Sequence, residues 1–145
     1  MYIVSACLLG IECKYNGGHN RNEKVLKFLS DKKYIAICPE TQGGLKAPRV
    51  PAEILENRVV SKNGEDLTEV FKHGAEEAWK TAKEASDSES EPIEAAILMP
   101  RSPSCGTGMI YDGSFSGKLI EGDGIAAALF RAAGIKLILP QDLQL

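Results

Sequence analysis

The feature that most limits how this chain can fold is an alternation of short apolar runs with segments of helical periodicity. The apolar runs cover residues 2–7, 34–38, 94–99 and 135–139. Short, largely continuous apolar runs are typical of strands that are covered on both faces, as in parallel sheets. Helices between such strands supply the crossover connections. We therefore predict an α/β fold, with residues 1–145 forming one three-layer domain around a mostly parallel sheet.

The helices expected on the two faces of this sheet have recognisable starts and stops. Residues 22–30 and 123–134 have helical periodicity, and Gly134 is a typical residue for ending a helix. The clearest helix begins at Asp66, where Asp66 and Glu69 resemble a capping box.

The segments between these elements are expected to be irregular. Residues 39–53 contain two glycines and three prolines and are predicted to be a loop. Residues 86–92 are predicted to be an acidic surface linker within the domain. A short strand from residue 58 and a hairpin around Asp112-Gly113 complete the expected elements.

Composition limits the compartment and the partners. The 145-residue chain has a net charge of −3, which gives no electrostatic argument for a nucleic-acid groove or an anionic membrane. The N-terminal segment lacks a signal peptide's basic region, and no apolar run approaches the roughly 18 residues of a membrane helix. We expect a cytoplasmic protein with reduced cysteines and a small-molecule ligand. The sequence does not determine the oligomeric state.

Three cysteines occupy the same place in the predicted topology. Cys7 ends the first apolar run, Cys38 ends the second, and Cys105 follows the third by a few residues. The carboxyl ends of parallel strands lie along one edge of a sheet, where open α/β sheets bind ligands. For any one of these cysteines, the simplest interpretation is a small core residue that ends a strand. Because three share this position, we favour a site in which their thiols converge.

Three convergent thiolates favour one class of cofactor. The chain has no C-x₂-C pair, which disfavours a zinc ribbon or finger. Three protein thiolates suit a cubane iron–sulfur cluster that leaves one iron open to a substrate. Cys13, six residues after Cys7, could be a fourth ligand, a resolving thiol or an ordinary loop cysteine, and we favour the last.

Polar residues in the adjoining loops are further candidates. Glu40 could act as a general acid and base, and the alternative is a solvated loop charge. Ser102 and Ser104 could donate hydrogen bonds to a ligand, although loop serines usually satisfy the backbone. Arg49 could bind a carbonyl or carboxylate of a ligand, or be an ion-pair partner.

Several motifs, in order over almost the whole chain, resemble the thiouracil desulfurase family. They are SACLLG, KYNGG, CPETQGGLKAPRVPAE, GEDLTEVFKHGA, RSPSCG, IYDGSFSG and GDGIAAALF. The resemblance implies that Cys7, Cys38 and Cys105 hold a [4Fe–4S] cluster whose fourth iron takes the sulfur of a substrate. It also implies that Glu40 and Ser102 are the acid/base and positioning groups.

The activity implied by the resemblance is non-redox removal of sulfur from thiolated nucleobases such as thiouracil, with release of hydrosulfide. This chain has Lys14-Tyr15-Asn16-Gly17 where many relatives have Arg-Tyr-Asp-Gly, and Met99 where many have Lys. These departures concern the choice of substrate more than the cluster.

Two alternatives belong to other functional classes. In the first, the protein is a non-catalytic metal-binding or redox-sensing module in which Cys13 completes a closed site of four cysteines. In the second, the Gly-rich loops bind a nucleotide and the cysteines are structural. The second has little support, because the chain has no Walker motif and no Gly-x-Gly-x-x-Gly after a strand.

Overall fold

A four-stranded parallel sheet forms the centre of the protein, whose residues 1–144 are described here from a computed structural model. Its strands are β1 (Tyr2–Ser5), β2 (Tyr34–Ile37), β5 (Ala95–Ile97) and β8 (Lys136–Ile138), in the order β2-β1-β5-β8. Every neighbouring pair is parallel. The predicted parallel sheet is therefore confirmed, and β1 and β5 are its two central strands.

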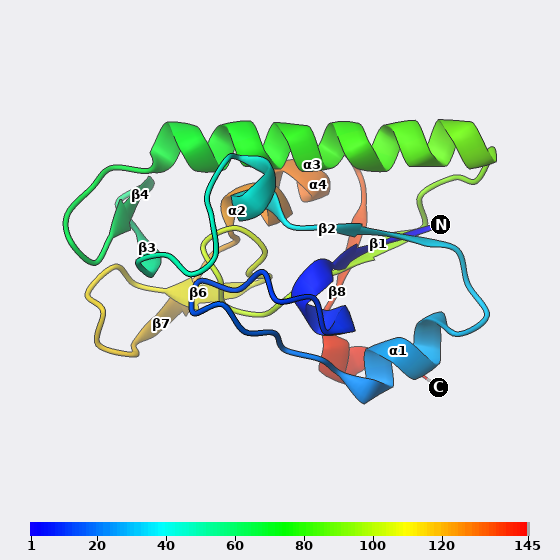
Figure 1. Ribbon diagram of the computed structural model, residues 1–145, viewed down its shortest axis with the longest axis horizontal. Helices are drawn as coiled ribbons and strands as arrows, with labels where there is room; N and C mark the ends of the chain where they lie inside the picture. The colour runs from blue at the N-terminus through cyan, green and yellow to red at the C-terminus, as the bar shows by residue number, and fades with distance from the viewer. Residues whose placement is uncertain (145) are drawn as a thin grey trace.

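Helices cover both faces of this sheet, so the three-layer prediction is also confirmed. Side chains of α3 (Thr68–Glu89) and α4 (Ile125–Ala132) pack with Ile3 and Ala96 on one face. Helix α1 (Glu23–Leu29) covers the other face, together with two short 3-10 helices, Ala6–Leu9 and Pro140–Asp142. Figure 1 shows α3 and α1 on opposite sides of the strands. Because both faces are covered, apolar residues predominate along the two central strands.

A close contact between two helices fixes the segment after β2. The short helix α2 (Pro39–Gln42) packs on α3 at Gly74, where an added Cβ would lie 1.9 Å from the carbonyl oxygen of Pro39. Only glycine allows this approach. The contact places Cys38, the residue that precedes α2, and Glu40, within α2, at the carboxyl edge of the sheet.

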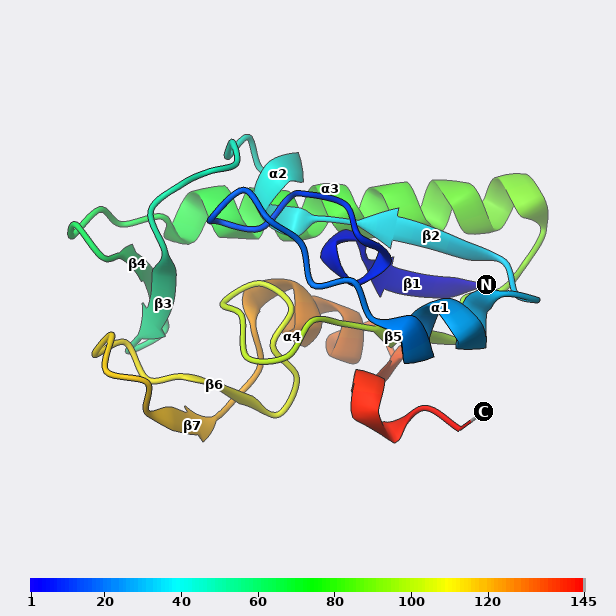
Figure 2. The same cartoon turned by 60° about the horizontal axis from the view of Figure 1, so that its bottom comes forward.

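Two antiparallel hairpins lie beyond that edge. One consists of β3 (Ala52–Leu55) and β4 (Arg58–Ser61), and the other of β6 (Met109–Tyr111) and β7 (Leu119–Glu121). Figure 2 shows both hairpins at the end of the molecule toward which β1 and β2 point. The second hairpin encloses Asp112-Gly113, as predicted.

Several predicted boundaries are wrong. Residues 39–53 are not a continuous loop, because Pro39 starts α2, where its fixed φ suits a first helical turn, and β3 begins at Ala52. The expected linker at 86–92 is helical as far as Glu89, and α3 ends where Ser90 adopts a left-handed conformation. Strands β1 and β2 each stop before the cysteine that we expected to end them, because the chain turns into a helix there.

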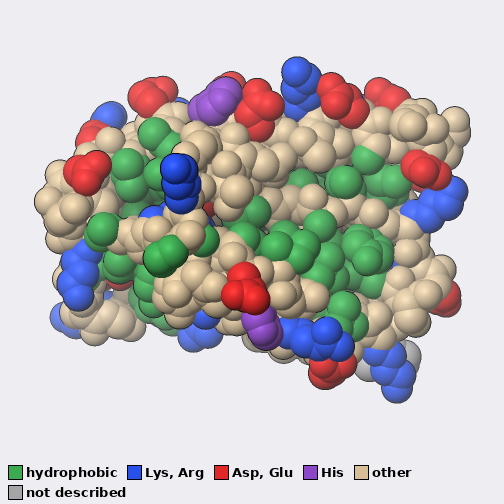
Figure 3. Space-filling view, in the orientation of Figure 1, with side chains coloured by type: hydrophobic (Ala, Val, Ile, Leu, Met, Phe, Trp, Pro, Cys, Tyr) green, Lys and Arg blue, Asp and Glu red, His purple; other side chains and the backbone are tan. Residues whose placement is uncertain are grey.

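The outer surface is mixed in charge. Acidic and basic side chains are interspersed along the outer side of α3 on the face shown in Figure 3. Within the described part of the chain, no helix has the length and apolar character needed to cross a membrane.

Candidate functional site

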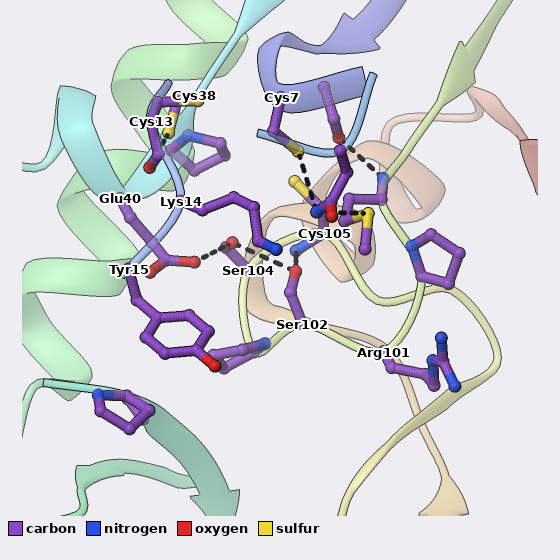
Figure 4. Close-up of a pocket in the computed structure, with 18 of the residues that line it drawn as sticks. Cys7, Cys13, Lys14, Tyr15, Cys38, Glu40, Arg101, Ser102, Ser104 and Cys105 are labelled. Carbon is purple, nitrogen blue, oxygen red and sulfur yellow. Dashed lines mark hydrogen bonds between the residues drawn. The ribbon is translucent and has the colours of Figure 1, made fainter. Parts of the chain in front are cut away.

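A cavity of about 490 Å³ opens where the parallel strands end, and all four cysteines line it. Cys7 lies in the 3-10 helix after β1, Cys38 directly precedes α2, and Cys105 lies in the loop after β5. Strands β2, β1 and β5 are consecutive in the sheet, so these segments become neighbours although they are distant in sequence. The structure thus brings together the three cysteines that the sequence analysis grouped (Figure 4).

The Cys105 loop is held by its own serines and by α4. The amide of Cys105 donates a hydrogen bond to Ser102 Oγ at 2.8 Å. Gly124, which precedes α4, lies so close that an added Cβ would be 2.5 Å from the carbonyl carbon of Ser104. This packing buries Ser104 and Cys105.

Glu40 is held through both of its carboxylate oxygens. Ser104 Oγ donates a hydrogen bond to Oε2 at 2.7 Å, and Arg49 Nε donates to Oε1 at 3.1 Å. The side chains of Arg49 and Glu40 are only 11% and 15% exposed. Glu40 is therefore not the solvated loop charge that we considered as an alternative, and its carboxylate is fixed in orientation within the cavity.

Arg49 makes its contacts to the protein. Besides Glu40, its Nη2 donates to the carbonyl oxygen of Cys13 at 2.8 Å, and its Nη1 donates to that of Lys46 at 3.2 Å. The ion-pair alternative for Arg49 is the one that the structure shows.

Cys13 is not an isolated loop cysteine. It is buried and lines the same cavity, and its carbonyl oxygen accepts a hydrogen bond from Cys38 Sγ at 3.9 Å. The neighbouring Cys38 lowers the pKa of Cys13, but the neighbouring Cys7 and burial outweigh this effect and raise that pKa to about 11. Cys13 therefore shares the cavity with the three strand-end cysteines.

The thiols of Cys105 and Cys38 are also held in the neutral form. Burial raises the pKa of Cys105 to about 12, and the nearby hydroxyl groups of Ser5 and Ser104 only partly offset this effect. The neighbouring Cys13 side chain, followed by burial, raises the pKa of Cys38 well above its ordinary range. A positive group bound here would replace these protons, since thiolates are the form that binds metal.

Several residues that line the cavity were not among our candidates. Asn20 Nδ2 donates hydrogen bonds to Met99 Sδ at 3.3 Å and to Cys7 Sγ at 4.0 Å. Lys14, Tyr15 and Arg101 also line the cavity (Figure 4), as does Phe115. Most of them stand in the motifs that carry the family resemblance, and a motif of this kind does not separate a ligand contact from a turn residue.

Comparisons with known proteins identify the family of this chain. The sequence model of 2-thiouracil desulfurase matches residues 2–142. The chain belongs to the 2-thiouracil desulfurase family. A family relative from Bacillus subtilis (strain 168), the uncharacterised protein YbbK, is 44% identical over 99% of this chain and 97% of its own.

A solved structure shares both the fold and much of the sequence. It is the [4Fe-4S]-dependent thiouracil desulfidase TudS, with a TM-score of 0.85 and 38% identity. The match covers 98% of this chain and 91% of that one.

Proposed function

We propose that this protein is a [4Fe–4S]-dependent desulfurase that replaces the sulfur of a thiolated nucleobase, such as thiouracil, with oxygen and releases hydrosulfide. The observation that carries the proposal is the convergence of three strand-end cysteines on one cavity beside the doubly hydrogen-bonded Glu40. Membership of the family and the similarity to TudS support the same reaction. Residues 1–145 would act as one desulfurase-like domain in the cytoplasm, where its four free thiols stay reduced.

The donor set suits a cluster better than a single ion. Among residues 1–144, no group of three or more Cys, His, Asp or Glu side chains is arranged to hold one metal ion. In a four-iron cluster each thiolate binds a different iron, so its ligands lie farther apart than those of a single ion. We propose that Cys7, Cys38 and Cys105 are the ligands and that one iron has no protein ligand. When bound, the cluster would supply a Lewis acid for the sulfur of the substrate.

The chain's own residues would manage water and protons. Glu40 would accept a proton from the water that adds to the thiocarbonyl carbon, and its fixed orientation favours that transfer. The carbon then gains the water oxygen, the carbon–sulfur bond breaks, and a carbonyl forms. One proton of the water ends on the hydrosulfide, and the other is released to solvent.

The serines would orient this chemistry. Ser104 uses its proton in the hydrogen bond to Glu40, so we assign it to positioning the carboxylate. Ser102 Oγ accepts the amide proton of Cys105, and its own hydroxyl proton, which faces Ser104 Oγ across a long 3.4 Å contact, would turn to the substrate. Ser102 lies 3.4 Å from Ser104, within the same chain of polar groups.

One assay tests the proposed function. Protein reconstituted with iron and sulfide without oxygen should convert thiouracil to uracil with one equivalent of hydrosulfide, and heat-inactivated protein should not. Acid-labile sulfide should be present at about four per chain. Reconstituted protein that contains this cluster but releases no sulfide from thiouracil would contradict the proposal.

A second candidate is favoured by one observation, the burial of Cys13 in the same cavity, where its carbonyl oxygen accepts a hydrogen bond from Cys38 Sγ. If Cys13 were a fourth ligand, the protein would be a non-catalytic metal-binding or redox-sensing module with a closed site. Replacing Cys13 by alanine separates the two. An open-iron enzyme keeps its cluster and its activity in Cys13→Ala, whereas a closed four-thiolate site loses its metal as fully as in Cys7→Ala.

A further inference from the structure

The loop between β6 and β7 is attached to the other hairpin by a single carboxylate. Glu53, on β3, accepts hydrogen bonds through Oε1 from the amides of Gly113 at 3.0 Å and Phe115 at 3.1 Å. Gly113 has φ +94° and lies so close to β3 that an added Cβ would be 2.7 Å from Leu55 Cβ. The loop therefore follows the position of β3.

This attachment holds Phe115 in an unusual backbone conformation. Phe115 has φ +57°, a left-handed conformation that large residues seldom adopt without outside support. Its half-buried side chain lines the cavity that contains the cysteines, and Tyr111 and Glu53 line it as well. The cost of this conformation is offset by the two hydrogen bonds to Glu53. The result is an aromatic wall, formed by Phe115, on the cavity that the cysteines line.

We infer that Phe115 selects planar heteroaromatic substrates by packing against their ring, and that Glu53 is the positioning residue that sets the aromatic wall. This inference rests on the proposed function, and it adds the group that would distinguish a thiolated base from an aliphatic thioamide. Stacking of a base on an aromatic side chain depends on the flat face of the ring and does not require one particular base.

The inference predicts a particular pattern of kinetic effects. Phe115→Ala should raise KM for thiouracil roughly 5- to 100-fold, the range expected for loss of one base–aromatic stack. Its kcat should change little, because Phe115 does not touch the reacting atoms. Phe115→Tyr should stay within about 3-fold of wild type, since the ring is kept. Turnover of thioacetamide, which has no ring, should be the same in wild type and Phe115→Ala.

The role of Glu53 requires a second measurement. Glu53→Ala should also raise KM for thiouracil. The double variant Glu53→Ala/Phe115→Ala should have the same KM as Phe115→Ala alone, because both changes remove the same interaction with the ring. Leu119→Ala and Glu121→Ala are matched controls, since both residues are exposed on β7 of the same hairpin. Neither control should alter KM.

A binding measurement keeps this inference separate from the proposed function. Calorimetry with uracil and cluster-free protein should show binding to wild type that weakens at least 5-fold in Phe115→Ala. Equal uracil affinity in wild type and Phe115→Ala, when both have the same melting temperature, would overturn the inference. An unchanged KM for thiouracil in Phe115→Ala would overturn it as well. If wild type binds uracil through Phe115 but releases no sulfide from thiouracil, the proposed function is wrong and the inference about Phe115 is retained.

Discussion

Glu40 is the residue whose chemistry is best defined by its neighbours, since Ser104 and Arg49 each hold one of its oxygens. Glu40→Gln keeps the size and one acceptor oxygen but cannot take a proton at neutral pH. We expect kcat for sulfide release to fall by about 10²- to 10⁴-fold, the usual contribution of a general acid or base. The iron and sulfide content should stay at the wild-type level.

Glu56→Gln, at the exposed turn between β3 and β4, is a suitable control and should be fully active. A Glu40→Gln variant with wild-type kcat would exclude Glu40 as the group that moves the proton. Loss of the cluster in this variant would instead assign Glu40 a role in assembling the site.

At the residue scale the sequence predicted which side chains meet but not how they pair. The strand-end pattern was sufficient to bring Cys7, Cys38 and Cys105 together, because topology alone decides it. The pairing of Arg49 with Glu40 depends on the fold of residues 39–53 against α3, which the sequence pattern did not contain. Cys13 was set apart for the same reason, since its contacts come from the path of a loop and not from a strand.

The packing of α2 on α3 is the element-scale contact on which the site depends most directly. Gly74→Ala would place a methyl group against the backbone of Pro39, which cannot move without displacing Cys38 and Glu40. Overpacking of this kind costs about 1–3 kcal/mol, although alanine favours the helix by almost 1 kcal/mol. We expect a lower free energy of unfolding in urea and poorer cluster retention.

Glu76→Ala, at an exposed position of the same helix, measures the propensity effect alone. It should be neutral or slightly stabilising and should keep the cluster. If Gly74→Ala matched it in both respects, the separation of α2 and α3 would not limit the geometry of the site.

The contact at Gly74 also explains which elements the sequence could not predict. The long apolar face of α3 and the four strands were read correctly, because burial on both faces produces periodic patterns. Helix α2 is a single turn, too short to have a period, and glycines and prolines around it indicate a loop when read locally. Its helical conformation is selected by the tertiary contact.

A second element-scale interaction connects α4 to the β6–β7 hairpin. Asp123 accepts hydrogen bonds from the Gly108 amide at 2.9 Å and from Arg131 Nε at 2.7 Å. Arg131 chiefly, with the Gly108 amide, holds the pKa of Asp123 below its usual value, partly offset by burial. Because the folded-state pKa is the lower one, this stabilisation is present above about pH 4 and is lost as pH falls through the folded-state pKa.

Asp123→Asn should therefore destabilise the protein by about 1 kcal/mol at pH 7, a small value because Arg131 is exposed. The difference from wild type should shrink in urea titrations below about pH 4. Asp142→Asn, which removes a carboxylate outside this ion pair, is the control for the loss of one negative charge. A difference that is independent of pH would show that the Asp123 charge does not contribute.

At the scale of the whole molecule, the site consists of segments that only the complete fold brings together. The 3-10 helix after β1, α2 after β2 and the loop after β5 carry one proposed ligand each. A group bound to all three favours the folded chain over the unfolded one, because it connects three strand ends at once. Cluster loading should therefore raise the stability of the entire domain.

We expect the anaerobic melting temperature to be higher by about 5 °C or more in loaded protein than in the same protein after chelation, since each kcal/mol shifts Tm by a few degrees in a domain of this size. Cys38→Ala should melt at one temperature before and after reconstitution. Cys13→Ala should keep the increase if three thiolates are sufficient. If loading changes the colour of the protein but not its melting temperature, the cluster would be bound without joining the three strand ends, and the proposed ligand set would be wrong.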